Sequence, residues 1–289
     1  MTAGAVHPAE AGAGNTPPAD RWPALAGLPD HYVWQYVECP GSDRLTVVLA
    51  PGASLMDRSV DFGSNVLFLA DPTTTYFLVR APFAAKAILA QLDVQGLRSV
   101  IFTGYSKGGF GAILLAGLCA KAAPRRAVHC VAFGPQTRLD PFNPRLADTP
   151  SYQLLRKRAT ERQGLAIYLE KLGDLAFVQR MPNLLIRIVY AEGSPADAGE
   201  AGYLCAPNIQ KYPVAFPYHR VRVVADLRDR PREEIAHGVL QLQKLARRDA
   251  DLAATLDADL DKAVDFVIGN RWLPDYPALL DQTVAIRLS

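Results

Sequence analysis

Residues 100–111 read Val-Ile-Phe-Thr-Gly-Tyr-Ser-Lys-Gly-Gly-Phe-Gly, and this stretch decides the fold. Its first part, Val100–Thr103, is apolar and rich in residues that favour strands, so it predicts a buried strand. The segment Gly108–Lys121 is dense in Ala, Leu and Ile and predicts a helix. Between the two lies the pattern Gly-x-Ser-x-Gly. This order predicts a sharp strand-to-helix turn with Ser106 at its apex.

The predicted turn explains two of the glycines. An abrupt turn brings the residues two positions before and after the apex into contact, so we expect that only glycine fits at positions Gly104 and Gly108. The hydroxyl of Ser106 is then exposed above the sheet. The start of the following helix offers free N–H groups and a positive dipole end, which suit a developing oxyanion. The alternative is a Gly-rich turn that only packs, because the five-residue pattern alone is weak.

The composition is that of a globular protein. The chain has 289 residues, of which 49% are hydrophobic and 21% charged, so it can bury a full core. The net charge of +2 gives no argument for nucleic acid or an anionic membrane as a partner. No apolar run reaches about 18 residues, so no transmembrane helix is predicted. The first 20 residues lack the features of a secretory signal, and we expect a cytoplasmic protein.

The cysteines are scattered and form no Cys-x-x-Cys pair. They are predicted to be reduced thiols, mostly buried, rather than a disulfide framework or a metal site: Cys39, Cys119, Cys130 and Cys205. No metal and no cofactor are expected from the sequence.

Short apolar runs alternate with helical segments along the chain. Strands are predicted at 32–38, 45–50, 66–70, 100–103, 127–133, 184–190 and 221–225. Helices are predicted at 81–94, 108–121, 150–180, 235–246 and 252–267, with a short one at 199–211. This alternation predicts an α/β fold, a mostly parallel sheet with helices on both faces.

The domain organisation is predicted to be simple. Residues 1–30, rich in Ala, Gly and Pro at their start, are expected to be a disordered or extended tail. Residues 31–289 are expected to form a single domain, because no linker interrupts them. Residues 140–182 are the longest excursion between predicted strands, and we expect them to form a small helical lid.

A nucleophilic serine needs a base within hydrogen-bond reach, and the base needs a carboxylate to orient it. His237 follows the exit of the strand predicted at 221–225 and therefore lies on the same sheet edge as Ser106, so it is the predicted base. The other histidines lie in the tail, before the first strand, inside a strand, or at the opposite edge before the last predicted strand: His7, His31, His129 and His219.

The predicted acid comes from the exit of the strand at 184–190. Asp197 lies past the turn there and is the first choice, and Glu192, closer to the strand end, is the second. Asp140 is a third choice, and Asp226 stays open. Each of these carboxylates has the alternative role of a turn former or a solvated charge.

The oxyanion needs two N–H donors. One is predicted to be the backbone N–H of Lys107, directly after the nucleophile. The other is predicted to be that of Ala53, in the turn after the strand at 45–50, where Gly52 allows close approach of the backbone. A plain Pro-Gly turn is the alternative. A Ser–Lys pair between Ser106 and Lys107 is disfavoured, because adjacent residues at such a turn point in different directions.

The stretch 104–109, together with a later Asp and His, resembles the α/β-hydrolase superfamily over roughly residues 32–270. Four shorter segments are similar to a serine hydrolase branch found beside glycan and capsular polysaccharide genes: 65–71, 104–111, 133–137 and 237–240. The sequence departs from many esterases in lacking a His-Gly-Gly oxyanion turn, and the connection from the strand at 221–225 to His237 is long and charged.

The resemblance implies a function as well as a fold. It implies an esterase-like serine hydrolase that forms an acyl-enzyme on a small-molecule or glycan ester. Two alternatives stay open: an acyltransferase that uses the same residues, and a non-catalytic binding or scaffolding protein on the same fold.

Overall fold

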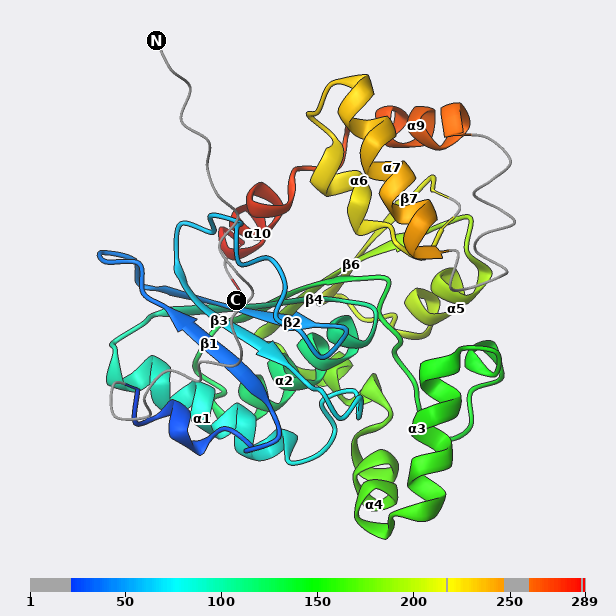
Figure 1. Cartoon of the computed structure of the whole chain (residues 1–289). Coiled ribbons are helices and arrows are strands. Elements are labelled where there is room, and N and C mark those ends of the chain that lie inside the picture. The colour runs from blue at the N-terminus through cyan, green and yellow to red at the C-terminus, as the bar shows by residue number, and fades with distance from the viewer. Residues whose placement is uncertain (1–21, 217, 247–259, 287, 289) are drawn as a thin grey trace, which may run out of the picture.

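The structure is a computed structural model that describes residues 22–216, 218–246, 260–286 and 288. Its centre is a seven-stranded sheet in the order β1-β3-β2-β4-β5-β6-β7, drawn as arrows in Figure 1. Strand β1 runs antiparallel to β3, and the other neighbouring pairs are parallel. The predicted α/β fold with a mostly parallel sheet is therefore confirmed.

The strands are β1 Val33–Val37, β2 Arg44–Ala50, β3 Asn65–Ala70, β4 Ser99–Tyr105, β5 Val128–Phe133, β6 Leu184–Ala191 and β7 Ile209–Val214. The helices are α1 Ala81–Val94, α2 Lys107–Ala122, α3 Pro150–Glu161, α4 Gln163–Leu172, α5 Pro195–Tyr203, α6 Arg222–Leu227, α7 Arg232–Ala246, α9 Leu260–Gly269 and α10 Tyr276–Val284. The described residues also contain three short 3-10 helices: η1 Leu25–Gly27, η2 Pro144–Leu146 and η3 Leu175–Arg180.

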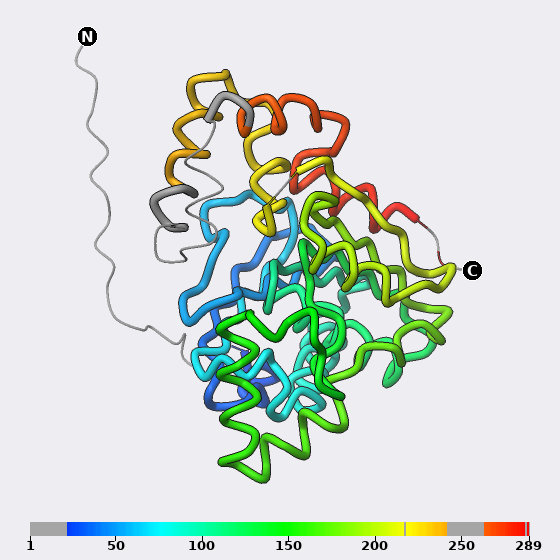
Figure 2. Tube along the Cα trace, turned by 90° about the vertical axis from the view of Figure 1, so that its right-hand side faces the viewer, coloured from blue at the N-terminus to red at the C-terminus, as the bar shows by residue number. Residues whose placement is uncertain are grey.

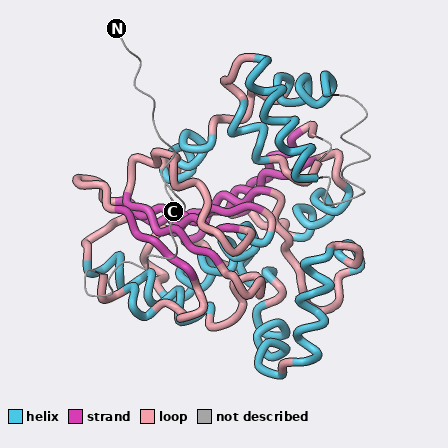
Figure 3. Tube along the Cα trace, viewed as in Figure 1, coloured by secondary structure: helices cyan, strands magenta, loops and turns pink. Residues whose placement is uncertain are grey.

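Two cores lie on the two faces of the sheet. Successive side chains of a strand point to opposite faces, so Leu45, Val47 and Leu49 of β2 belong to the core beneath α1 and α2. Val48 belongs to the second core, which is covered by α6, α7, α9 and α10. Each buried aliphatic side chain contributes about 1.5–3 kcal/mol. Figure 3 shows the helices on both sides of the continuous sheet, as the sequence predicts.

The last strand lies earlier in the chain than predicted. The predicted strand at 221–225 is part of helix α6 and the turn before it. The last strand is instead β7, which overlaps only the end of the segment 199–211 predicted as a short helix, while α5 covers the start of that segment. Val221, Val224 and Ala225 are buried at the i, i+3, i+4 spacing of one helix face, which overrides the strand preference of valine. Strand β7 is half-exposed at the sheet edge, where Pro213 is tolerated.

The N-terminal tail predicted at residues 1–30 extends too far into the chain. Residues 1–21, like part of the helix predicted at 252–267, lie outside the described residues. Residues 22–30, in contrast, are packed on the domain, because Trp22, Leu25 and Leu28 are buried in the core beneath α1. The boundary at residue 30 is therefore corrected, since the folded part already includes Trp22.

The segment predicted as a lid folds into α3, α4 and η3. Its helix α3 is tied to the loop after β3, because the hydroxyls of Tyr76 and Ser151 lie 2.8 Å apart and Arg158 donates to Thr74. Figure 2 shows this segment at the opposite end of the molecule from α7 and α9. The role as a lid stays a prediction. Within the described ranges, no helix has both the length and the apolar character needed to cross a membrane.

Candidate active site

Ser106 lies on a strained turn between β4 and α2. Its backbone angles, φ 54° and ψ −118°, belong to neither element. A Cβ atom on Gly104 would lie 2.2 Å from the carbonyl oxygen of Gly108, and one on Gly108 would lie 2.1 Å from that of Leu49. The predicted crowding between the two glycines is therefore present at Gly104, whereas Gly108 is crowded by the neighbouring strand β2. Such strain persists only where the surroundings enforce it, and it is typical of functional sites.

A chain of hydrogen bonds joins Ser106 to His219 and Asp197. The Oγ of Ser106 lies 2.9 Å from Nε2 of His219, and the Nδ1 of His219 lies 2.8 Å from Oδ1 of Asp197. Because a carboxylate only accepts, Nδ1 carries the proton and Nε2 is free to accept from the serine hydroxyl. The arrangement is that of a nucleophile, a base and an orienting acid.

Close contacts on two sides hold the imidazole of His219. On one side Gly134 has φ 49°, and a Cβ atom there would lie 3.2 Å from the ring, so glycine permits the approach. On the other side the ring of Tyr105 lies with its centroid 5.5 Å away. Burial raises the pKa of Tyr105, so its phenol is neutral at physiological pH. The imidazole side chain keeps 33% exposure and can meet a ligand.

Asp197 lies in the first turn of α5. Its backbone N–H donates to the hydroxyl of the capping residue Ser194 at 3.4 Å. The positive end of a helix dipole favours a carboxylate at this position. The residue is 6% exposed, and within the described part of the chain its Oδ2 has no hydrogen-bond partner. The predicted acid therefore contacts a histidine beside Ser106, and its catalytic role stays a prediction.

The histidine that contacts Ser106 differs from the predicted one. His237 lies exposed on α7, where its Nε2 is 3.2 Å from the side-chain nitrogen of Gln241. The choice of His237 is wrong for a physical reason: with the last strand placed at 221–225, His219 falls at the wrong edge of the sheet. Since the strand is β7, His219 instead follows its carboxyl end, on the edge that holds Ser106.

The other candidate acids are engaged elsewhere or exposed. Glu192 is exposed at the end of β6. Asp140 pairs with Arg156 at 2.7 Å. Asp226 pairs with Arg222 at 3.3 Å. Asp197 is therefore the one of the four that contacts a histidine.

The two predicted oxyanion donors lie on different segments of the chain. Lys107 is the first residue of α2, where a backbone N–H has no partner inside the helix. Ala53 lies in the exposed turn after β2, and its role stays a prediction. Burial lowers the pKa of the Lys107 ammonium, and the charge of Asp71 opposes that shift. Within the described residues no hydrogen bond links the Lys107 side chain to Ser106.

Sequence reasoning missed Gln136 as a site residue. Its Nε2 lies 3.4 Å from the Oγ of Ser106, and the residue is 5% exposed. It follows the carboxyl end of β5, the strand next to β4 in the sheet. This position could have been read from the sequence, because the carboxyl ends of neighbouring parallel strands meet at the same edge of the sheet.

A small hollow lies beside Tyr105. It has a volume of about 250 Å³, and its other lining residues are Met56, Asp57, Arg220, Arg222, Val223 and Asp226. The Arg222 guanidinium is held by both carboxylate oxygens of Asp57 at 2.6 Å. The hollow is below the usual 300–1,000 Å³ of a ligand pocket, so it offers room for one small group. No group of three metal-ligating side chains occurs in the part of the chain that the structure describes.

Comparisons with known proteins give matches among solved structures alone. No family model and no curated protein matches the chain. A lipase-esterase related protein from Clostridium acetobutylicum is 13% identical, with a TM-score of 0.41, over 65% of this chain and 92% of that one. Carboxyl esterase 2 from Tuber melanosporum is 14% identical, with a TM-score of 0.42, over 65% and 76%.

A third match covers more of the chain. A protein of unknown function from Staphylococcus aureus is 14% identical, with a TM-score of 0.38, over 83% of this chain and 95% of that one. These values are too low to assign an activity. The α/β-hydrolase fold follows instead from the strand order and from the turn at Ser106. The narrower resemblance to a glycan-linked branch stays a prediction.

Proposed function

We propose that the protein is a serine hydrolase that cleaves an ester or related acyl bond through an acyl-enzyme intermediate. The observation that supports this is the unbroken hydrogen-bond chain from Ser106 through His219 to Asp197. A serine hydroxyl is a weak nucleophile at neutral pH, and this chain supplies the base that activates it. In a non-catalytic protein, nothing would require these three side chains to meet on a strained turn.

The proposed reaction has two halves. In the first, the Oγ of Ser106 bonds to the acyl carbon while Nε2 of His219 takes the hydroxyl proton. Asp197 accepts from Nδ1 and stabilises the imidazolium that forms. Collapse of the tetrahedral intermediate breaks the bond to the leaving alcohol, which receives the proton from His219. In the second half, water attacks the acyl-enzyme with His219 as base, and the acid product leaves Ser106 restored.

The developing negative charge needs donors near the acyl oxygen. We assign the first to the backbone N–H of Lys107, at the positive end of α2. The N–H of Ala53 is the proposed second donor, because its turn follows β2, the strand next to β4. The hollow beside Tyr105 suits a small group on the acyl or the alcohol side.

A fluorophosphonate probe tests the proposal, because it labels only an activated serine. We expect labelling of the wild type and none of Ser106→Ala, whereas the exposed control Ser59→Ala keeps full labelling. A short-chain aryl ester should likewise be hydrolysed by the wild type and by Ser59→Ala, but not by Ser106→Ala. A folded wild type that reacts with neither compound would contradict the proposal.

A further inference from the structure

Gln136 occupies an unusual position beside the nucleophile. The side chain is 95% buried, with its Nε2 3.4 Å from the Oγ of Ser106. Its carbonyl Oε1 is also buried and has no hydrogen-bond partner among the described residues. An amide in such a place costs about 1–3 kcal/mol relative to an apolar side chain of the same shape. A purely structural position would therefore favour a leucine or a methionine.

A buried carboxylate holds the segment that carries Gln136. Oε2 of Glu200 accepts from the backbone N–H of Thr137 at 2.8 Å and from that of Arg138 at 3.2 Å. The hydroxyl of Thr137 is shared between the backbone carbonyl of Glu200 at 2.8 Å and Oε2 at 3.0 Å. Oε1 of Glu200 accepts from the side chain of Asn143 at 2.7 Å. Glu200 is 2% exposed, and hydrogen bonds to a buried charge are the strong kind. The backbone directly after Gln136 is therefore rigidly fixed.

The backbone directly before Gln136 is fixed as well. A Cβ atom on Gly109, in the first turn of α2, would lie 3.1 Å from the Cβ of Pro135. The ring of Pro135 thus rests on the helix that begins at the nucleophile. Held on both sides, Gln136 has little freedom to move its amide away from Ser106. This is the arrangement expected of a preorganised donor.

We infer that Gln136 is a side-chain hydrogen-bond donor to the reacting oxygens, with Glu200 as the residue that positions it. The inference rests on the proposed function. Before reaction, Nε2–H donates to the Oγ of Ser106, which leaves the hydroxyl proton directed at His219. Once Oγ has attacked, the same N–H is in reach of the tetrahedral intermediate. It adds a donor to the backbone N–H of Lys107.

Gln136→Met tests the inference, because methionine has the same length and no donor. With a short-chain aryl ester, we expect kcat/KM to fall about 10- to 100-fold with KM within twofold, since the lost bond acts in the transition state. The affinity for an arylboronic acid, which forms a tetrahedral adduct on serine, should fall by the same factor. Gln153→Met is the matched control, because Gln153 makes a comparable bond on the exposed surface of α3.

A double-mutant cycle tests the role of Glu200. Glu200→Gln should lower kcat/KM several-fold in the wild type and cause no further loss in Gln136→Met, because it acts through the same amide. If Gln136→Met does not fold, Gln136→Asn keeps the amide but withdraws it from the serine, and we expect the same loss.

Three results would overturn the inference: kcat/KM of the Gln136 variant within twofold of the wild type, a rise in KM alone, or additive losses in the cycle. A folded wild type that no fluorophosphonate labels is a different result, because it overturns the proposed function itself.

Discussion

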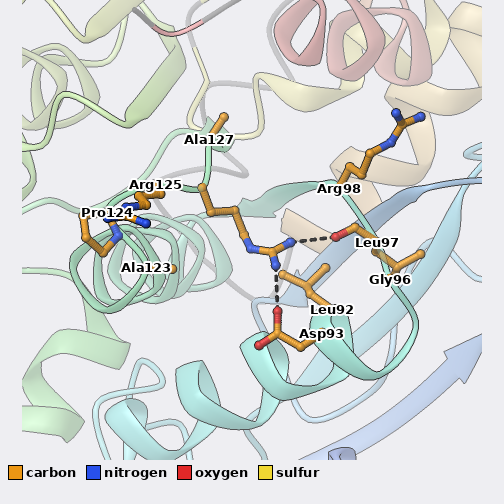
Figure 4. A pocket seen from close by; sticks show the side chains of 10 residues that line it. Leu92, Asp93, Gly96, Leu97, Arg98, Ala123, Pro124, Arg125 and Ala127 are labelled. Carbon is orange, nitrogen blue, oxygen red and sulfur yellow. Dashed lines mark hydrogen bonds and ion pairs between the residues drawn. The ribbon is translucent and has the colours of Figure 1, made fainter.

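The two edges of the sheet differ in what their hollows contain. The amino edge holds the larger one, about 740 Å³, between the C-terminal ends of α1 and α2 (Figure 4). Its Arg126 donates to the carbonyl of Leu97 at 2.6 Å and to Asp93 at 2.7 Å. The guanidinium of Arg126 therefore holds residues that line this hollow together. The carboxyl edge has smaller hollows, of about 330 and 250 Å³, but next to the smaller of these a serine, a histidine and an aspartate form a chain of hydrogen bonds. The proposed function therefore rests on connected side chains at this edge rather than on the volume of a hollow.

The connection at the carboxyl edge follows from the order of the strands. Four neighbouring parallel strands, β4 to β7, each deliver one polar residue from their carboxyl ends. In that order these are Ser106, Gln136, Asp197 and His219. Loops at such ends lie side by side whatever their separation in the chain, which is why open α/β sheets bind ligands there.

The largest effect should come from His219, with His237 as its control. If the carboxyl edge does the chemistry, His219→Gln lowers kcat/KM for an aryl ester about 10³-fold or more, because the base is lost. His237→Gln is the matched control and should stay within twofold, because His237 is exposed on α7. The reverse pattern would break the comparison.

Asp197→Asn should follow, with a loss of about 10²- to 10⁴-fold in kcat, since the imidazole would lose its orienting carboxylate and its tautomer. Steady-state kinetics with the same ester measure it, at unchanged melting temperature. Glu192→Gln, an exposed carboxylate at the end of β6, serves as the control. Equal activity of both variants would show that Asp197 is not the acid.

Arg126→Ala sharpens the comparison from the amino edge. We expect a loss of about 1–2 kcal/mol in the free energy of unfolding, because two hydrogen bonds are removed and the Leu97 carbonyl is left unpaired. Urea titration measures this, and kcat/KM should not change. Arg125→Ala, an exposed arginine of the same hollow, should leave both quantities as they are. A drop in turnover for Arg126→Ala would mean that this edge takes part in function.

The smallest effect concerns His129, buried near the amino end of β5. Burial lowers its pKa, and its bond to the Ile286 carbonyl opposes the shift only in part. Below about pH 6.5 the unfolded chain binds a proton at His129 more readily than the folded protein does. The free energy of unfolding therefore decreases as the pH is lowered, until His129 is protonated in the folded state too. Urea midpoints at pH 7.5 and pH 5 should differ less in His129→Gln than in the wild type. An unchanged difference would contradict this account.

The sequence predicts most of the fold because the central strands are buried on both faces. Five strands read as apolar runs, β1 reads as an alternating strand, and the turn at Ser106 has its own glycine pattern. Strand β7 is different, since Gln210, Lys211 and Pro213 at a half-exposed edge have no such signal. The valines that follow it look like a strand but form one face of α6.

The error in β7 carried over to the choice of histidine, because the position of His219 was judged from the misplaced strand. The contact of Asp197 with a histidine was predictable, since β6 is a clear apolar strand and Asp197 follows its turn. Gln136 was not, because its contact with Ser106 depends on how the chain from 135 to 138 is tied down. That tie comes from Glu200, 63 residues beyond Thr137. The residues around Gln136 alone cannot predict a hydrogen bond to a side chain so far along the chain.

Helix α5 carries both Asp197 and Glu200, one turn apart and both buried. Asp197 orients the imidazole, and Glu200 anchors the segment on the far side of the serine. A rotation or translation of this nine-residue helix would therefore disturb the contact of Asp197 and that of Glu200 at the same time. In a chimera with another protein of this fold, residues 194–203 should therefore be exchanged as one segment. A crossover inside them would separate the contact of Asp197 with His219 from the contact of Glu200 with Thr137.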